Sequence, residues 1–448
     1  MKHLFLISLL IIGIASDSSA QQAVPEGVHN FSLQECINYA YEHQDSVLNA
    51  QLDVKSAEYK VKETTGIGLP QVSGSASFTD YVKIPTTLIP GQFFGQPAGT
   101  FIPVQFGVKY QSALGLNLSQ ILFDGSYLVG LKASKTYKEL SQRNYTRSKI
   151  DANIGVTKAY YQVLVSNEQI RLLDANINQL KQQVDQTAAQ NKEGLVELVD
   201  VQRIQVQYNN LITNRENTLR LLALNYQLLK FQMGMDVNDQ LVLTDKLENI
   251  KLADLADIGA DTTFYHNRIE YNLAETKKKL NELDVENKKS KFYPTLTLNG
   301  SYNSSYQNNN FSDLYSRSFP SSFFGLTLNV PIFNGGQRSN QLKQSRISVL
   351  KSQNDLENAK NGLLLEGNKA HITFVNSLRS LDNQKQNQQL AQEVLRVSKI
   401  KYQQGVGSSI EVTQAQTALE DADNKYIQSL YDALVSKVDL DKAYGKIQ

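Results

Sequence analysis

One stretch occurs twice in the chain, as GLNLSQILFDG at Gly115–Gly125 and as GLTLNVPIFNG at Gly325–Gly335. Both copies alternate apolar with polar residues, which predicts a β-strand, and both end in Phe-x-Gly, which predicts a turn into the next element. Further along the chain, Gly194 and Gly405 lie at nearly the same separation as the two copies. This interval exceeds the roughly 20–50 residues of a solenoid repeat. We therefore interpret the chain as two copies of one plan.

The composition argues against several classes of protein. Lys and Arg number 45 and Asp and Glu number 44, so the net charge of +1 lacks the basic excess of a nucleic-acid binder. The body of the sequence has no apolar run of about 20 residues, so we expect no transmembrane helix. Cys36, which we expect in the core, is the only cysteine, and the five histidines lie far apart. We therefore expect no metal site and no cofactor. Since no catalytic triad motif or phosphate-binding loop is present, we expect no enzyme.

The N-terminus has the pattern of a secretory signal peptide. Lys2 and His3 precede the apolar run Leu4–Ile14, and Ser18-Ser19-Ala20 gives a small-x-small cleavage pattern. This apolar run is too short to span a membrane, so we favour a signal peptide over 1–20 rather than an anchor. The sequence therefore predicts export across the inner membrane of a bacterium.

Each copy of the plan also contains one long and two shorter helical segments. The segment 126–192 lacks proline and carries apolar residues at heptad spacing; at ~1.5 Å per residue its helix would be roughly 100 Å long. The two shorter helices together match the long one, which predicts four rods of equal length per chain. We expect a first repeat over 21–235 with helices 34–64, 126–192 and 196–233, a linker over 236–262, and a second repeat over 263–448 with helices 263–291, 336–403 and 409–445.

The segments 70–123 and 294–333 have the pattern of outer-membrane β-strands. Polarity alternates with a period of two, as in Thr295–Tyr306, and charged residues are scarce. Tyr and Phe gather in both segments; because the chain has no Trp, they must supply any interfacial aromatic girdle. An ordinary soluble antiparallel sheet is the alternative interpretation.

The number of strands has a consequence for assembly. We expect four strands per chain, and about eight are needed to close even a small barrel. Open strand edges in lipid would leave backbone groups unpaired. The sequence therefore predicts that several copies of the chain share one sheet.

The layout resembles the TolC family of outer-membrane efflux proteins over essentially the whole mature chain. The residues that carry the resemblance are Ser32–Ala40 (SLQECINYA), the joints Leu122–Gly125 and Ile332–Gly336, and Tyr402–Gly405 followed by Ile410–Val412. The resemblance implies a mainly α fold with a transmembrane β part. It also implies a homotrimer in which four strands per chain form one shared 12-stranded barrel, continued by a long periplasmic α-helical barrel.

The resemblance implies a function as well. The protein would be a passive exit channel in the cell outer membrane, surrounded by outer-membrane lipid and extending into the periplasm. It would serve a tripartite efflux or type I secretion system, with a periplasmic adaptor and an inner-membrane transporter as partners and no nucleic acid. The alternative is a periplasmic coiled-coil adaptor or structural protein, although we see no lipoyl-like or β-barrel domain of an adaptor. The cargo is not specified by the sequence.

The family motif also implies roles for residues at the periplasmic end of the helices. Glu411 matches the first of two acidic residues that line a narrow entrance, but Gln414 stands at the second position. Tyr402 matches a tyrosine that ties the closed tip in relatives, and Gly407 replaces an arginine of the same latch. Asp200 stands where relatives have a tip aspartate.

For Glu411 and Asp200 a simpler interpretation is available. An acidic residue at the start of a helix is favoured by the helix dipole and needs no role in a pore. The pore hypothesis is that three Glu411 carboxylates crowd at the tip, where their repulsion disfavours closure and attracts cations. The remaining candidates are the tip turns for adaptor docking, Gly194, Gly405 and Gly407, and the helix–strand junctions, Pro70, Pro294, Phe123, Gly125, Phe333 and Gly335.

Overall fold

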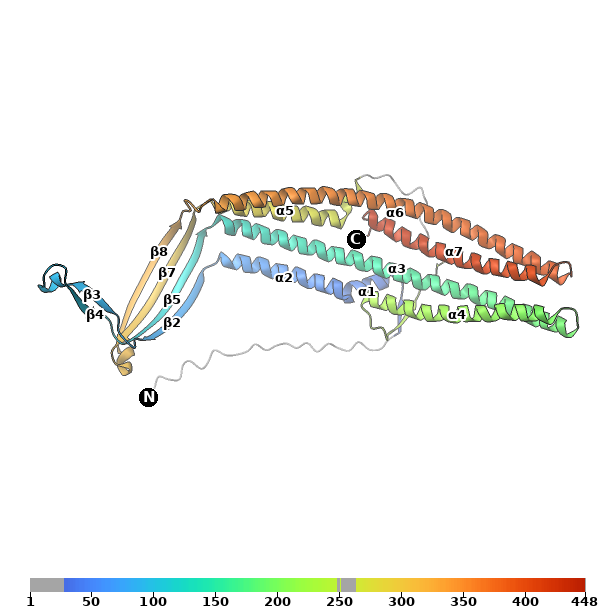
Figure 1. The fold of residues 1–448 in the computed structure, drawn as a ribbon, viewed down its shortest axis with the longest axis horizontal. Coiled ribbons are helices and arrows are strands. Elements are labelled where there is room, and N and C mark those ends of the chain that lie inside the picture. The colour runs from blue at the N-terminus through green and yellow to red at the C-terminus, as the bar shows by residue number, and fades with distance from the viewer. Residues whose placement is uncertain (1–27, 248–249, 251–262, 448) are drawn as a thin grey trace.

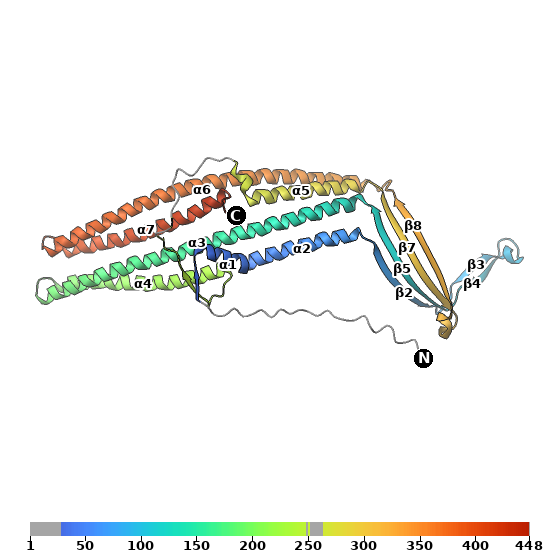
Figure 2. The ribbon, with the colours of Figure 1, turned by 180° about the vertical axis from the view of Figure 1, so that it is seen from behind.

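Two very long helices dominate the computed structural model, which describes residues 28–247, 250 and 263–447. They are α3 (Gly125–Lys192), of 68 residues, and α6 (Gln337–Gln403), of 67 residues, each roughly 100 Å long at ~1.5 Å per residue. Figures 1 and 2 show both of them running along the length of the molecule, with shorter helices between them. The expected signal peptide 1–20 and most of the linker 236–262 lie outside the described residues.

The shorter helices lie end to end along the long ones. Figure 1 shows α2 and α4 along α3, and α5 and α7 along α6. The lengths of α2 and α4 are 23 and 36 residues, and those of α5 and α7 are 22 and 35 residues. The bounds are α1 Leu33–His43, α2 Asp45–Ile67, α4 Leu198–Met233, α5 Ile269–Ser290 and α7 Ser409–Ala443.

Two helix boundaries differ from those expected. The single helix expected over 34–64 is divided at Gln44, whose φ of −71° and ψ of 126° are extended rather than helical. The helix expected from residue 263 begins at Ile269, because Phe264–Asn267 forms a separate 3₁₀ turn. Both interruptions lie near the middle of the molecule, where the shorter helices of each half approach each other end to end (Figure 1).

A four-stranded antiparallel sheet continues from one end of the helices. Its order is β2-β5-β7-β8, formed by β2 (Gln71–Asp80), β5 (Tyr110–Phe123), β7 (Thr295–Asn308) and β8 (Ser318–Asn329). The pairing of β5 with β7 joins the two halves of the chain, and the two copied stretches lie in β5 and β8. Within the described part of the chain, the outer edges of β2 and β8 have no strand partner. The sheet is therefore open on both sides.

The two faces of this sheet differ in polarity. Across the strands, Leu118 pairs with Gly300 and Gly300 with Phe324, whereas the adjacent row on the other face runs through Asn117, Ser301 and Phe323. The first face carries Val72, Phe78, Leu114, Leu116, Leu118, Leu296, Leu298, Tyr302, Phe324, Leu326 and Leu328. The opposite face carries mostly Ser, Thr, Asn and Gln. This segregation is the pattern of a membrane barrel strand, with one face toward lipid and one toward water.

The apolar face is uncovered in the single chain. Phe324 is 78% exposed and Leu326 is 66% exposed, and none of the described helices or strands packs on the sheet as a second layer. Such an extended apolar surface needs a lipid or protein environment. Within the described residues, no helix is both long enough and apolar enough to span a membrane.

Two small sheets complete the described fold. One is a hairpin of β3 (Thr86–Pro90) and β4 (Phe101–Gln105), which projects beyond the far end of the large sheet (Figure 1). In the other, β1 (Val28–Phe31) pairs in parallel with β6 (Gln240–Leu243), so the start of the described chain is tied to the segment after α4.

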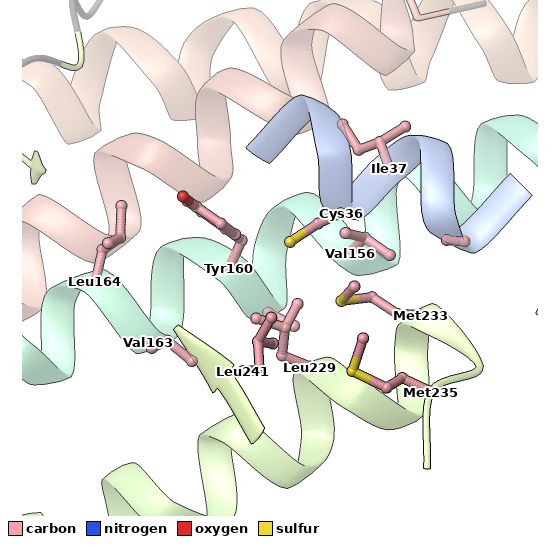
Figure 3. Close-up of a cluster of buried hydrophobic side chains, with 12 residues drawn as sticks. Cys36, Ile37, Val156, Tyr160, Val163, Leu164, Leu229, Met233, Met235 and Leu241 are labelled. Carbon is pink, nitrogen blue, oxygen red and sulfur yellow. The ribbon is translucent and has the colours of Figure 1, made fainter. Parts of the chain in front are cut away.

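A buried cluster near the middle of the molecule holds α1, α3 and α4 together. Figure 3 shows Cys36, Tyr160, Met233 and Leu241 converging from these three helices and β6. Cys36 is 0% exposed, which confirms its expected place in the core of the first helix. The carboxylate of Asp245 accepts hydrogen bonds from the Tyr160 hydroxyl at 2.8 Å and the Leu33 amide at 2.9 Å. This cluster fixes the segment after α4 against the helices.

Candidate functional site

The first strand-to-helix joint is a capped helix start. Phe123 ends β5, and the next residue, Asp124, accepts hydrogen bonds from the amides of Ser126 and Tyr127 at 2.7 and 3.2 Å. These bonds satisfy amides that have no partner inside the helix. A Cβ on Gly125 would lie 3.0 Å from the Ser290 Cβ, so the glycine lets α3 and α5 approach closely. In the same half, Pro70 immediately precedes β2.

The second joint also leads from a strand to a long helix, but it uses different residues. Pro294 immediately precedes β7, as Pro70 precedes β2. Gly335 and Gly336 have φ of 64° and 79°, in the left-handed region that favours glycine. Phe333, just before them, is 87% exposed in the single chain. The chain therefore turns from sheet to helix here through glycines rather than through an acidic cap.

At the opposite end of the molecule, both helical hairpins turn through glycine. Gly194 after α3 and Gly405 after α6 have φ of 72° and 75°. Left-handed glycines of this kind end helices and allow following amides to bond back to the last carbonyls. Gly407 is different, because a Cβ there would lie 2.9 Å from the Lys401 Cβ and 3.0 Å from the Tyr402 nitrogen. A larger residue at Gly407 would therefore push against the end of α6.

A polar link joins the starts of α4 and α7. Ser409 donates a hydrogen bond from its hydroxyl to Asp200, and the Arg203 guanidinium contacts Asp200 at 3.1 Å and the Ser409 Oγ at 2.9 Å. Gln207, one turn further along α4, donates to the Thr413 carbonyl at 3.3 Å. We call Asp200, Arg203 and Ser409 the tip link. It connects the two hairpins within one chain.

Tyr402 lies near the tip link, at the end of α6. Its ring is half-buried, and burial raises the pKa of its hydroxyl, with the negative charge of Asp200 adding to the rise. Thr187 lies beside this hydroxyl and lowers the pKa a little, yet the two make no hydrogen bond of standard geometry in the described chain. Asp200 and Tyr402, two of the sequence candidates, are therefore close to each other.

Glu411 and Gln414 stand apart from the tip link. Both are exposed on α7, and neither side chain makes a hydrogen bond or ion pair within the ranges that the structure describes. The Glu411 amide donates to the Ser408 hydroxyl at 3.2 Å, so Glu411 occupies the first turn of a capped helix. In the single chain, this position also agrees with the simpler interpretation of a charge favoured by the helix dipole.

Arg203 and Ser409 were not among the candidates expected from the sequence. Arg203 follows Asp200 by three residues at a helix start, a spacing that brings the two side chains together on one face. Its contact with Ser409 spans 206 positions and depends on how the two hairpins lie against each other. The sequence alone could therefore indicate the contact of Asp200 with Arg203 but not the contact with Ser409.

Comparison with known proteins agrees with this geometry. A family model described as outer membrane efflux protein matches residues 36–221 and 272–446. The outer membrane protein TolC of Vibrio cholerae is 22% identical over 338 residues, which are 74% of this chain and 76% of that relative. The probable efflux pump outer membrane protein TtgC of Pseudomonas putida is 23% identical over 439 residues, 96% of this chain and 86% of TtgC. The crystal structure of CusC has the same fold, with a TM-score of 0.78 at 17% identity over 96% of this chain and 95% of CusC.

Long helical hairpins that continue into an open, two-faced sheet define a subunit of a membrane channel. The chain belongs to the outer membrane efflux protein family, whose model matches more than half of it. It is an outer-membrane exit channel rather than an enzyme, and the resemblance to the TolC family is confirmed. The alternative of a periplasmic adaptor is therefore set aside.

Proposed function

We propose that three copies of the chain form one passage from the periplasm to the outside. The open edges of β2 and β8 support this assembly, because four strands are too few for a barrel and three copies supply 12. The strands alternate in direction along the sheet, so β8 of one copy can pair antiparallel with β2 of the next. Pairing β8 with β2 at all three subunit boundaries would give the outer-strand backbone groups the hydrogen-bond partners that lipid cannot supply.

The polar face of the sheet would line the passage, and the apolar face would contact outer-membrane lipid. We assign the helices to the periplasm, where three sets of rods would continue the barrel as a tunnel about 100 Å long. The two repeats expected over 21–235 and 263–448 would each contribute half of the barrel wall and half of the tunnel wall of one subunit. The single observation that carries this proposal is the two-faced sheet with two open edges at one end of the helices.

The periplasmic tip is the proposed meeting point with partners. In a tripartite efflux or type I secretion system, the turns at Gly194, Gly405 and Gly407 would dock onto a periplasmic adaptor that joins an inner-membrane transporter. The tip link would replace the latch arginine of relatives, since Arg203 contacts Asp200 on its own helix and Ser409 of the neighbouring hairpin. Glu411 would face the entrance, with Gln414 one turn further along the same helix, and Tyr402 would brace the closed tip.

Efflux in cells and conductance in bilayers test this function together. Deletion of the gene should raise the sensitivity of cells to toxic compounds. Reintroduction of the intact gene should restore resistance, and its product should be recovered in the outer-membrane fraction. The purified protein should form discrete ion-conducting channels in planar bilayers. Recovery of the chain in the soluble periplasm, or the absence of channels from a folded trimer, would contradict the proposal.

A further inference from the structure

A cavity of about 250 Å³ lies between the two helical hairpins, well away from the tip link. It is formed by α3, α4 and α7, which run side by side in Figures 1 and 2. Leu173, Leu211 and Ile427 provide an apolar wall. Asn176, Glu420 and Asp423 provide a polar one. The cavity is therefore amphipathic, as small-molecule sites usually are.

Asp423 is a buried acid whose partners are all neutral amides. Its side chain is 7% exposed and accepts hydrogen bonds from Asn176 of α3 and Gln388 of α6, both at 2.7 Å. Among the residues that the structure describes, no Lys, Arg or His lies within ion-pair distance of it. A buried carboxylate is costly unless it is paired, so this acid leaves a negative charge to be compensated.

Glu420 brings a second carboxyl group to the same cavity. Its Oε1 is buried without a hydrogen-bond partner in the described chain. Burial raises the pKa of Glu420; the Gln416 amide offsets part of this effect, and the charges of Asp421 and Asp423 add to it. Among the residues that the structure describes, no cationic group contributes to this shift. The two acids of the cavity are thus close enough to influence each other and are both uncompensated.

Gln416, one turn before Glu420 on α7, faces Glu420 and also lacks hydrogen-bond partners of standard geometry in the part of the chain that the structure describes. It is 1% exposed, and neither atom of its amide makes a hydrogen bond of standard geometry within the described residues. Buried amides are nearly always satisfied in folded proteins. Among these described residues, Glu420 therefore brings one unpaired buried oxygen to the cavity wall, and the Gln416 amide beside it offers no bond of standard geometry.

We propose that the cavity binds a small organic cation, with Glu420 and Asp423 receiving its ammonium group and the leucine and isoleucine wall receiving its hydrocarbon part. A protonated amine supplies the positive charge that both carboxylates lack and a hydrogen-bond donor for the unpartnered Glu420 Oε1. A metal ion would need more oxygen ligands and would gain nothing from the apolar wall. The volume suits an amine with about one ring. This site is additional to the passage of the proposed function and does not depend on it.

Ligand-observed NMR on the full-length trimer in detergent tests the site. Benzylamine, which is cationic at neutral pH, is the probe, and benzyl alcohol is its neutral counterpart of similar shape. We expect saturable binding of benzylamine and at least about tenfold weaker binding of benzyl alcohol. Equal affinities for the two compounds, or no saturable binding up to about 20 mM benzylamine, would overturn the proposal.

Two substitutions and a matched control locate the binding site. Glu420→Gln and Asp423→Asn remove the charges with little change of shape, and each should weaken benzylamine binding about tenfold. Asp432→Asn removes an exposed charge from α7 outside the cavity lining and should leave affinity unchanged. A melting curve first establishes that each variant is folded. If Asp423→Asn does not fold, the affinity of Glu420→Gln for benzylamine decides whether the cavity is the site. An equal loss in Asp432→Asn and Glu420→Gln would contradict a site inside the cavity. Because binding is measured independently of conductance and efflux, a negative result for this site is distinguishable from a negative result for the channel function.

Discussion

Asp200 of α4 and Ser409 of α7 are hydrogen bonded to each other across the two helical hairpins. Arg203 contacts both of them, so the two tip turns of one chain are held together by a charged residue that lies outside either turn. Because the link connects the hairpins rather than stabilising either one alone, its loss should affect tip movement more than folding.

Arg203→Ala removes the guanidinium of the tip link. It should cost about 1 kcal/mol of local stability, because the lost bonds are only partly buried. We expect a higher open probability or conductance in single-channel recordings, since the hairpins can then move apart more easily. Arg220→Ala is the matched control, because Arg220 is exposed on the same helix and its nearest acid, Glu216, lies 3.9 Å away. If both variants conduct like the parent, the tip link does not restrain the tip.

Glu411→Gln tests whether this exposed acid faces the entrance. Three carboxylates around one narrow opening attract cations, and the neutral amide does not. We therefore expect weaker block by multivalent cations applied from the periplasmic side. Asp421→Asn, also exposed and on the same helix, should leave the block unchanged. Undiminished block in Glu411→Gln would favour the simple helix-start interpretation.

Gly405→Ala and Gly362→Ala form a pair with opposite expected effects. Gly405 has a φ of 75°, so alanine there should cost about 1–2 kcal/mol. Gly362 lies inside α6 with open space around its Cα, so alanine there should stabilise by about 0.5–1 kcal/mol. Chemical unfolding of both variants measures the difference. A Gly405→Ala protein as stable as the parent would show that the turn does not need the left-handed conformation.

Glu270 should make stability depend on acidity. Burial raises the pKa of Glu270, but its hydrogen bond to Arg268 at 3.0 Å and the attraction of that guanidinium lower it more, so the net shift is downward. A lowered pKa in the folded state means that this contribution is present above about pH 4.5 and disappears as the pH falls. Unfolding measured against pH should therefore show a shallower acid loss for Glu270→Gln. Glu275 is exposed, so Glu275→Gln should keep the parent's dependence of unfolding free energy on pH. The same dependence in all three proteins would contradict a contribution from Glu270.

Much of the fold followed from local sequence patterns. Proline-free heptads predicted the long helices, and period-two alternation predicted the strands, because both signals depend only on near neighbours. The break at Gln44 was missed, since it depends on how the chain crosses the middle of the molecule rather than on a proline or glycine. The contact of Arg203 with Ser409 and the uncompensated Asp423 also escaped prediction, because each results from the packing of one hairpin against the other.

The most direct test of the proposed assembly is disulfide crosslinking between β2 and β8 in outer membranes of intact cells. Single cysteines at Ser73, Ser75 or Ser77 are each combined with one at Ser321, which covers several registers of the polar face. Native Cys36 does not compete, because burial raises its pKa to about 12. We expect at least one pair to give a ladder that stops at the covalent trimer. A ladder that continues past three copies, or no crosslink in any register, would contradict a closed barrel of three chains.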